Sequence, residues 1–107
     1  MNRPDLVSVP PDILPNDHGG EDVRRWVRGI NEWTLWLTAS GLSPTTIATR
    51  RYQISRLAEA HLRRSPWRLS TNDLAGWLGS HDWDPATLST YSSALRQFYD
   101  WARIAHH

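Results

Sequence analysis

Four stretches of the chain carry apolar side chains at the three-to-four-residue spacing of an amphipathic helix. They cover about residues 21–40, 44–64, 71–79 and 85–104. No segment alternates between apolar and polar residues as a half-buried strand does, and the links between the four stretches are short. The pattern therefore predicts an all-α protein that folds as a compact four-helix bundle.

The apolar positions of each stretch predict the core. They are Val23, Trp26, Val27, Ile30, Trp33 and Leu37 in the first; Ile47, Ile54, Ala58, His61 and Leu62 in the second; Leu74, Trp77 and Leu78 in the third; and Leu88, Tyr91, Leu95, Phe98, Tyr99 and Ala102 in the fourth. Most of the seven tryptophans fall at inward or boundary positions, which favours packing over a ligand-stacking role. His61 is interpreted as a hydrogen-bonded boundary side chain rather than a metal ligand.

Two of the predicted helices open with nearly the same sequence. Ser43-Pro44-Thr45-Thr46-Ile47 and Asp84-Pro85-Ala86-Thr87-Leu88 both place a capping side chain directly before a proline. A Ser or Asp side chain accepts hydrogen bonds from the first turn, and proline at the first helical position has no N–H to leave unpaired. We therefore expect helices to begin at Pro44 and Pro85. Gly41 should end the first predicted helix, and Ser65-Pro66 should end the second, which begins at Pro44.

Residues 1–20 differ from the rest in composition and charge. They are rich in proline and glycine and predict a flexible acidic tail, which leaves residues 21–107 as the helical domain. Residues 1–23 hold one arginine and five acidic residues, whereas residues 24–107 hold eleven arginines and six acidic residues. All twelve basic residues are arginine, whose planar fork of donors suits phosphates and guanine edges, although a compositional bias toward arginine would give the same count.

No motif in the chain predicts a catalytic site. There is no cysteine, hence no thiol nucleophile and no disulfide, and there is no HExxH, glycine-rich phosphate loop or supported Ser/His/Asp set. No apolar run is long enough for a membrane span, and the first residues do not read as a secretory signal. We expect a cytoplasmic protein with no metal, no cofactor, no small-molecule substrate and no membrane partner.

The outer faces of the second and fourth helices carry hydroxyl, amide and guanidinium groups, as base-edge and phosphate contacts require. Solvated helix faces look similar, so two functions stay open: DNA binding, or a helical protein–protein interaction module. The predicted DNA-binding residues are Thr45, Thr46, Thr49, Arg50, Gln53, Arg56, Ser89, Thr90, Ser93, Arg96 and Gln97.

Four segments follow one another in an order that is typical of one family. They are Trp33-Thr34-Leu35-Trp36-Leu37, Gly41-Leu42-Ser43-Pro44-Thr45-Thr46-Ile47, Ser70-Thr71-Asn72-Asp73-Leu74, and Thr87-Leu88-Ser89-Thr90-Tyr91-Ser92-Ser93-Ala94-Leu95-Arg96-Gln97-Phe98-Tyr99-Asp100-Trp101. Through them, residues 30–102 resemble the N-terminal core-binding, SAM-like domain of phage integrases and other tyrosine recombinases. Arg50 stands where the family often has an aromatic residue, and Tyr52 follows two residues later.

The resemblance implies a non-catalytic domain that clamps one side of a recombination core site on double-stranded DNA. Its second and fourth helices would lie across the major groove, and other recombinase protomers would be possible partners. The chemistry would belong to a separate C-terminal catalytic domain, which we expect this chain to lack, so Tyr52, Tyr91 and Tyr99 are not read as nucleophiles. The parent protein would act in site-specific recombination or integration, at the nucleoid.

Overall fold

The structure is a computed structural model that describes residues 17–106. These residues form four α-helices and one short 3₁₀ helix, and no strand occurs among them. In chain order the elements are α1 (Asp17–Ala39), α2 (Pro44–Ala60), η2 (Pro66–Arg68), α3 (Thr71–Gly79) and α4 (Pro85–Ala105). The all-α prediction is confirmed.

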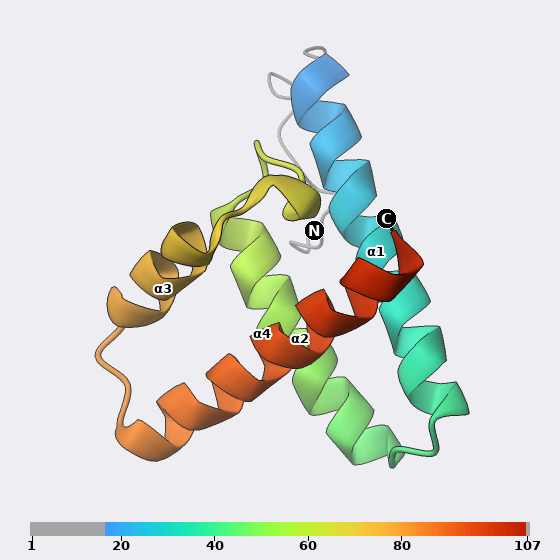
Figure 1. Ribbon diagram of the computed structural model, residues 1–107, viewed down its shortest axis with the longest axis vertical. Helices are drawn as coiled ribbons and strands as arrows, with labels where there is room; N and C mark the ends of the chain where they lie inside the picture. Colours follow the sequence, from blue (N-terminus) through green and yellow to red (C-terminus); the bar gives the residue numbers. More distant parts are fainter. Residues whose placement is uncertain (1–16, 107) are drawn as a thin grey trace, which may run out of the picture.

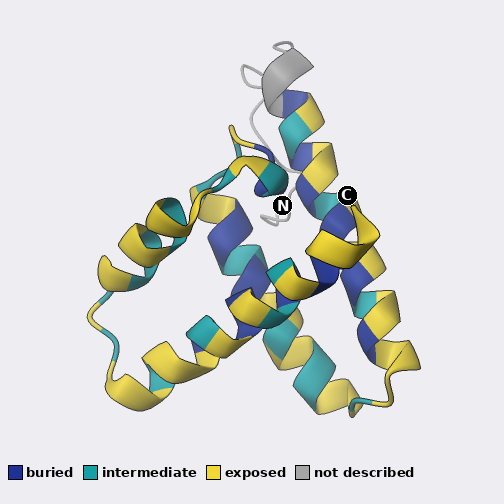
Figure 2. Cartoon of the chain, viewed as in Figure 1, coloured by how far each residue is buried: buried dark blue, intermediate teal, exposed yellow. Residues whose placement is uncertain are grey.

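The three long helices cross one another rather than lying side by side. Figure 1 shows α2 turning back from the end of α1, and α4 crossing α2 on its way to α1. The short helix α3 contacts α4, and η2 contacts α1. Buried residues gather where α1, α2 and α4 meet, whereas the N-terminal halves of α2 and α4 are mostly exposed or half-buried (Figure 2).

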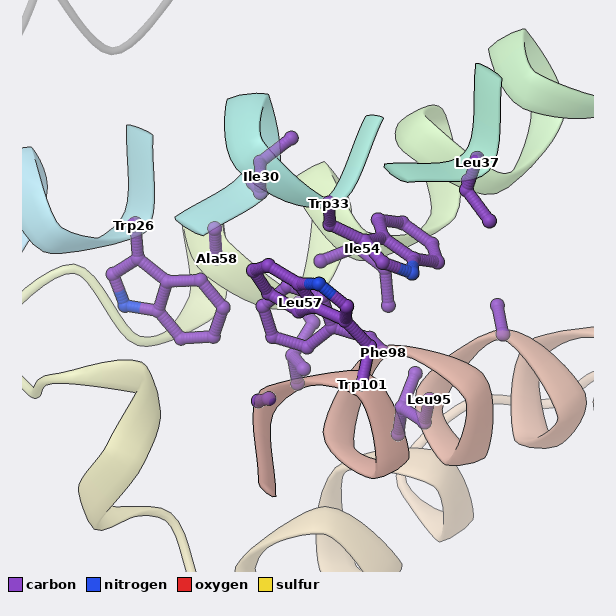
Figure 3. Packing of buried hydrophobic residues seen from close by; sticks show 12 residues of the cluster. Trp26, Ile30, Trp33, Leu37, Ile54, Leu57, Ala58, Leu95, Phe98 and Trp101 are labelled. Atoms are coloured by element: carbon purple, nitrogen blue, oxygen red, sulfur yellow. The ribbon is translucent and has the colours of Figure 1, made fainter. Parts of the chain in front are cut away.

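Phe98 of α4 is the centre of the aromatic core. It is fully buried, with its ring centroid 5.2 Å from Trp33, 5.8 Å from Trp67 and 6.3 Å from Trp26. Figure 3 shows Phe98 and Leu95 facing the tryptophans of α1 and the aliphatic side chains of α2. Gly29 of α1 allows the close approach of Trp67, because a Cβ there would lie 3.1 Å from the indole ring.

The predicted helix starts are confirmed, and each has its capping hydrogen bond. The Ser43 hydroxyl accepts from the Thr46 N–H at 3.2 Å, and the Asp84 carboxylate accepts from the Thr87 N–H at 2.7 Å. Helix α3 opens with a capping box, in which Ser70 and Asp73 each accept from the other's backbone N–H.

Gly41 ends α1 as expected, in the left-handed region with φ of +88°. The Gly41 N–H donates to the Thr38 carbonyl at 3.1 Å and the Leu42 N–H to the Leu37 carbonyl at 3.4 Å. This pair of bonds is the Schellman arrangement, which satisfies carbonyls that the helix end leaves free.

Two element boundaries differ from the sequence prediction by more than one residue. Helix α1 begins at Asp17 rather than residue 21, so residues 17–20 of the predicted tail are helical. The remainder of that tail, residues 1–16, lies outside the described residues. The two glycines before residue 21 are poor helix formers, but Gly20 is buried, so packing overrides propensity there. Helix α2 ends at Ala60 instead of residue 64.

The early end of α2 has a tertiary cause. The indole N–H of Trp26 in α1 lies 3.1 Å from the His61 carbonyl and 2.8 Å from the Arg64 carbonyl, and donates to both. These carbonyls therefore turn toward α1 instead of continuing the helix. Ser65, which is buried, then caps η2 by accepting from the Trp67 N–H at 3.2 Å.

The predicted core is confirmed with two exceptions. Six of the seven tryptophans are buried or half-buried, but Trp36 is 45% exposed, and Leu88, expected to face inward, is 38% exposed. Leu88 lies in the first turn of α4, beyond the region that the other helices cover. His61 is half-buried with its Nδ1 2.9 Å from the Leu57 carbonyl oxygen, as expected of a hydrogen-bonded boundary histidine.

Candidate nucleic-acid interface

A groove with a volume of about 230 Å³ runs between α2 and α4. Every residue that lines it belongs to the predicted DNA-binding set: Thr45, Thr46, Thr49, Arg50, Gln53 and Thr90. Five of them come from α2 and one from α4, so the crossing of the two helices brings distant parts of the sequence together. The groove offers hydroxyl and guanidinium groups beside the N-terminal end of α2, where backbone N–H groups favour anions.

Gln53 differs from its predicted placement. It was expected on the outer polar face, yet it is only 5% exposed. Its amide Nε2 donates to the Thr90 hydroxyl at 3.2 Å, and that hydroxyl donates to the Thr87 carbonyl at 2.8 Å. Gln53 therefore ties α2 to α4 next to the groove, and its amide is engaged within the protein.

Arg50 and Arg56 are half-buried on α2 and present positive charge near the groove. The Nε atom of Arg50 is buried without a hydrogen-bond partner in the described part of the chain. The Arg56 Nη1 donates to the Tyr91 hydroxyl at 3.4 Å, and this hydrogen bond raises the pKa of Arg56 above its ordinary value. Arg56 therefore keeps its positive charge at neutral pH.

The arginines divide into two groups by their partners. Arg25, Arg64 and Arg103 form ion pairs with nearby carboxylates at distances between 2.6 and 3.1 Å. Within residues 20–106, the predicted DNA-binding arginines, Arg50, Arg56 and Arg96, make no such pair, and Arg51, Arg63 and Arg68 make none either. Their charge is therefore not neutralised by a neighbouring carboxylate and is available to a phosphate.

The predicted residues of α4 do not all reach the same groove. Thr90 lines it, and Ser89 and Ser93 are exposed on α4. Arg96 and Gln97 instead line a second depression of about 360 Å³ together with Trp36, Asp100, Trp101 and Ile104. The structure thus places six of the eleven predicted residues around the groove, Ser89 and Ser93 on the exposed face of α4, Arg96 and Gln97 at the second depression, and Arg56 half-buried on α2.

The sequence did not reveal the aromatic residues around Arg56. Trp83 and Tyr91 both contact its guanidinium, and His81 stacks on Trp83. The available signal was the pair of rings at positions 81 and 83, directly before the Asp84 cap. Spacing within a loop does not determine where a side chain points, so the pattern could not assign these residues to the interface.

Neither a metal site nor a membrane-spanning helix is found among residues 17–106. No group of three or more His, Asp or Glu side chains is arranged there to hold a metal ion. None of the helices described is long and apolar enough to cross a membrane.

Comparison with known proteins identifies the family. The family model for the phage integrase N-terminal SAM-like domain matches residues 22–106, which include all four α-helices apart from the first turn of α1. No significant match occurs among curated proteins or among solved structures. The match agrees with the resemblance inferred from the sequence and with the observed all-α fold, and the chain therefore belongs to the family of phage integrase N-terminal SAM-like domains.

Proposed function

We propose that this domain binds double-stranded DNA as the non-catalytic, core-binding domain of a tyrosine recombinase. The observation that carries the proposal is the groove between α2 and α4, which is lined entirely by residues that the sequence predicts for DNA contacts. Membership of the integrase family supports a recombinase-related role. The proposed setting is site-specific recombination or integration inside the cell.

The contacts follow from the chemistry of the groove. Thr45, Thr46 and Thr49 would offer hydroxyls to phosphates and base edges, and Arg50 and Arg56 would reach phosphates or guanine. On α4, Ser89, Thr90 and Ser93 would approach the same duplex. Arg96 and Gln97 would contact it only if the DNA extends toward the C-terminal half of α4. Gln53 would act by holding the helices together rather than by reading a base.

The surroundings of the three tyrosines favour structural roles over a role as a nucleophile. The Tyr99 hydroxyl donates to the Pro66 carbonyl at 2.9 Å, and Tyr91 is buried against Arg56. Tyr52 is 60% exposed and has no base within hydrogen-bond reach in the described residues. We propose that strand cleavage belongs to a separate catalytic domain and that other recombinase protomers are partners at the recombination site.

A salt-dependent titration tests DNA binding. A fluorescein-labelled duplex of about 30 base pairs is titrated with the domain at several salt concentrations, and anisotropy reports the affinity. Arg50→Ala and Arg56→Ala should each weaken binding and lower the slope of log K against log salt by about one unit. Arg103→Ala is the matched control, because it removes the same charge from an arginine already paired with Asp100. Salt-independent binding, or an equal effect of Arg103→Ala, would contradict the proposal.

Exposed apolar side chains favour a second candidate, a protein–protein interaction module. Leu35, Trp36 and Ile104 are 71%, 45% and 85% exposed, and the last two line the same depression. Apolar patches of this kind mark partner surfaces. Two results together would favour this second function over DNA binding. The domain would not bind duplex DNA at low salt, and it would self-associate in sedimentation equilibrium in a way that Ile104→Ser abolishes.

A further inference from the structure

Three aromatic rings stack in a row at the junction between α3 and α4. His81 lies on Trp83 with ring centroids 4.0 Å apart and planes 11° apart, and Trp83 lies on Tyr91 at 4.1 Å and 16°. Trp77 of α3 meets His81, Trp83 and Tyr91 edge-on. The His81 Nδ1 also lies 2.8 Å from the Trp77 carbonyl oxygen. These contacts fasten the loop of residues 80–84 onto the first half of α4.

Arg56, from α2, meets two rings of this stack. Its Cζ lies over the Trp83 ring, 5.8 Å from the centroid, and its Nη1 donates to the Tyr91 hydroxyl at 3.4 Å. Glu59, one turn further along α2, is exposed; its charge helps to raise the pKa of Arg56, but the two side chains form no ion pair within the described residues. An indole and a phenol thus hold the guanidinium in place. Unlike a carboxylate, these uncharged groups do not neutralise its positive charge.

We propose that Trp83 and Tyr91 are positioning residues that hold the Arg56 guanidinium toward duplex DNA. The proposal rests on the proposed function and adds that the α3–α4 loop controls DNA affinity through Arg56. A free arginine side chain has many rotamers and loses that freedom when it binds a phosphate. A side chain already held by two partners loses less on binding, so the same contact gives a higher affinity.

The test compares two tyrosines of α4 that each lose one hydroxyl. Tyr91→Phe removes the hydrogen bond to Arg56 and should weaken duplex binding by roughly threefold to tenfold, the usual cost of ordering one long side chain on binding. Tyr99→Phe removes a hydrogen bond to the Pro66 carbonyl and should lower the melting temperature without changing DNA affinity. Trp83→Leu should weaken DNA binding as Tyr91→Phe does. Trp83→Phe keeps an aromatic ring face and should therefore retain most of the wild-type affinity.

A double-mutant cycle separates positioning from general stability. Tyr91→Phe should have no further effect on DNA affinity in the Arg56→Ala background, because the group it positions is gone. NMR relaxation of the Arg56 Nε–Hε group gives a direct readout. It should report an ordered side chain in the wild-type protein and a mobile one in Tyr91→Phe and Trp83→Leu.

The outcomes distinguish this inference from the proposed function. If the wild-type domain shows no salt-dependent binding, the proposed function fails and the inference falls with it. If the wild type binds and Arg56→Ala weakens binding, but folded Tyr91→Phe and Trp83→Leu variants have wild-type affinity and an ordered Arg56, only the inference is overturned. An equal effect of Tyr91→Phe with and without Arg56 would also overturn it. If Trp83→Leu does not fold, Tyr91→Phe and its double-mutant cycle with Arg56→Ala decide the matter.

Discussion

Asp73 and Asp84 are the residues whose ionisation matters most to the helix ends. Asp73 accepts a hydrogen bond from the Ser70 backbone N–H at 2.8 Å and pairs with Arg64 at 3.1 Å, which together lower its pKa from the ordinary 3.8. The hydrogen bond from the Thr87 backbone N–H, 2.7 Å long, lowers the pKa of Asp84 in the same way. In both cases the backbone donor is the largest cause.

These two shifts predict a loss of stability in acid. Since the folded state binds these protons more weakly than the unfolded state, the contribution is present above about pH 4 and disappears as the pH falls through the lowered pKa values. Asp84→Asn keeps a capping acceptor but cannot titrate. Its melting temperature, followed by circular dichroism from about pH 5 to pH 2, should therefore fall less steeply than that of the wild type. Parallel curves for the two proteins would contradict this assignment.

Ser43 makes the equivalent cap for α2 without a charge. Ser43→Ala removes the acceptor for the Thr46 N–H and should destabilise the domain by about 1 kcal/mol, measured by urea unfolding. Ser93→Ala is the matched control, because Ser93 is exposed within α4 and alanine is the better helix former there. That control should be neutral or stabilising, and a loss as large as that of Ser43→Ala would argue against a capping effect.

At the scale of elements, the corner between α1 and α2 depends on one backbone conformation. Gly41 adopts a φ of +88°, and its two flanking hydrogen bonds close the end of α1. A Cβ at Gly41 would meet no atom within 4 Å, so any cost of substitution is conformational rather than steric crowding by neighbours. Gly76 has equally open surroundings but lies inside α3.

The two glycines therefore predict opposite effects of the same change. Gly41→Ala should destabilise the domain by about 1–2 kcal/mol, because L residues disfavour a positive φ. Gly76→Ala should stabilise it by up to about 1 kcal/mol through helix propensity. Urea unfolding of both variants checks the pair, and two changes of the same sign would show that the local backbone does not decide the outcome.

At the scale of the whole molecule, stability is concentrated where three helices cross. Phe98 touches aromatic rings from α1, η2 and α4, so a single side chain joins three elements. The crossing that buries Phe98 also brings the N-terminal halves of α2 and α4 together at the groove. Core packing and the candidate interface are thus two consequences of one arrangement.

Phe98→Ala should cost roughly 3–5 kcal/mol, a large part of the stability of a small domain. Tryptophan fluorescence would follow unfolding in urea, since Trp26 and Trp33 lie against the deleted ring. Phe98→Leu, which keeps most of the volume, should cost clearly less and remain folded if the alanine variant does not. A cost below 1 kcal/mol for Phe98→Ala would show that the ring is not central to the core.

The sequence by itself determined the elements that depend on local interactions. The starts of α2, α3 and α4 were predicted correctly, because a capping side chain, joined in α2 and α4 by a proline, acts within the first turn. The burial of Leu95 and Phe98 followed from helical periodicity, and the four ordered segments were enough to indicate the integrase family that the comparison then showed. DNA contact by the predicted residues stays a prediction.

Features that depend on how the helices cross could not be predicted from the sequence and come from the tertiary packing. Contacts with Trp26 end α2 early, Gln53 is buried beside Thr90, and Trp36 is exposed. Six of the predicted DNA-binding residues line one groove, whereas Arg96 and Gln97 line a second depression. The packing also places Trp83 against Arg56. The physical reason is that a helical pattern specifies which side chains share a face, whereas the part of that face a neighbour covers is set by packing between residues far apart in the sequence.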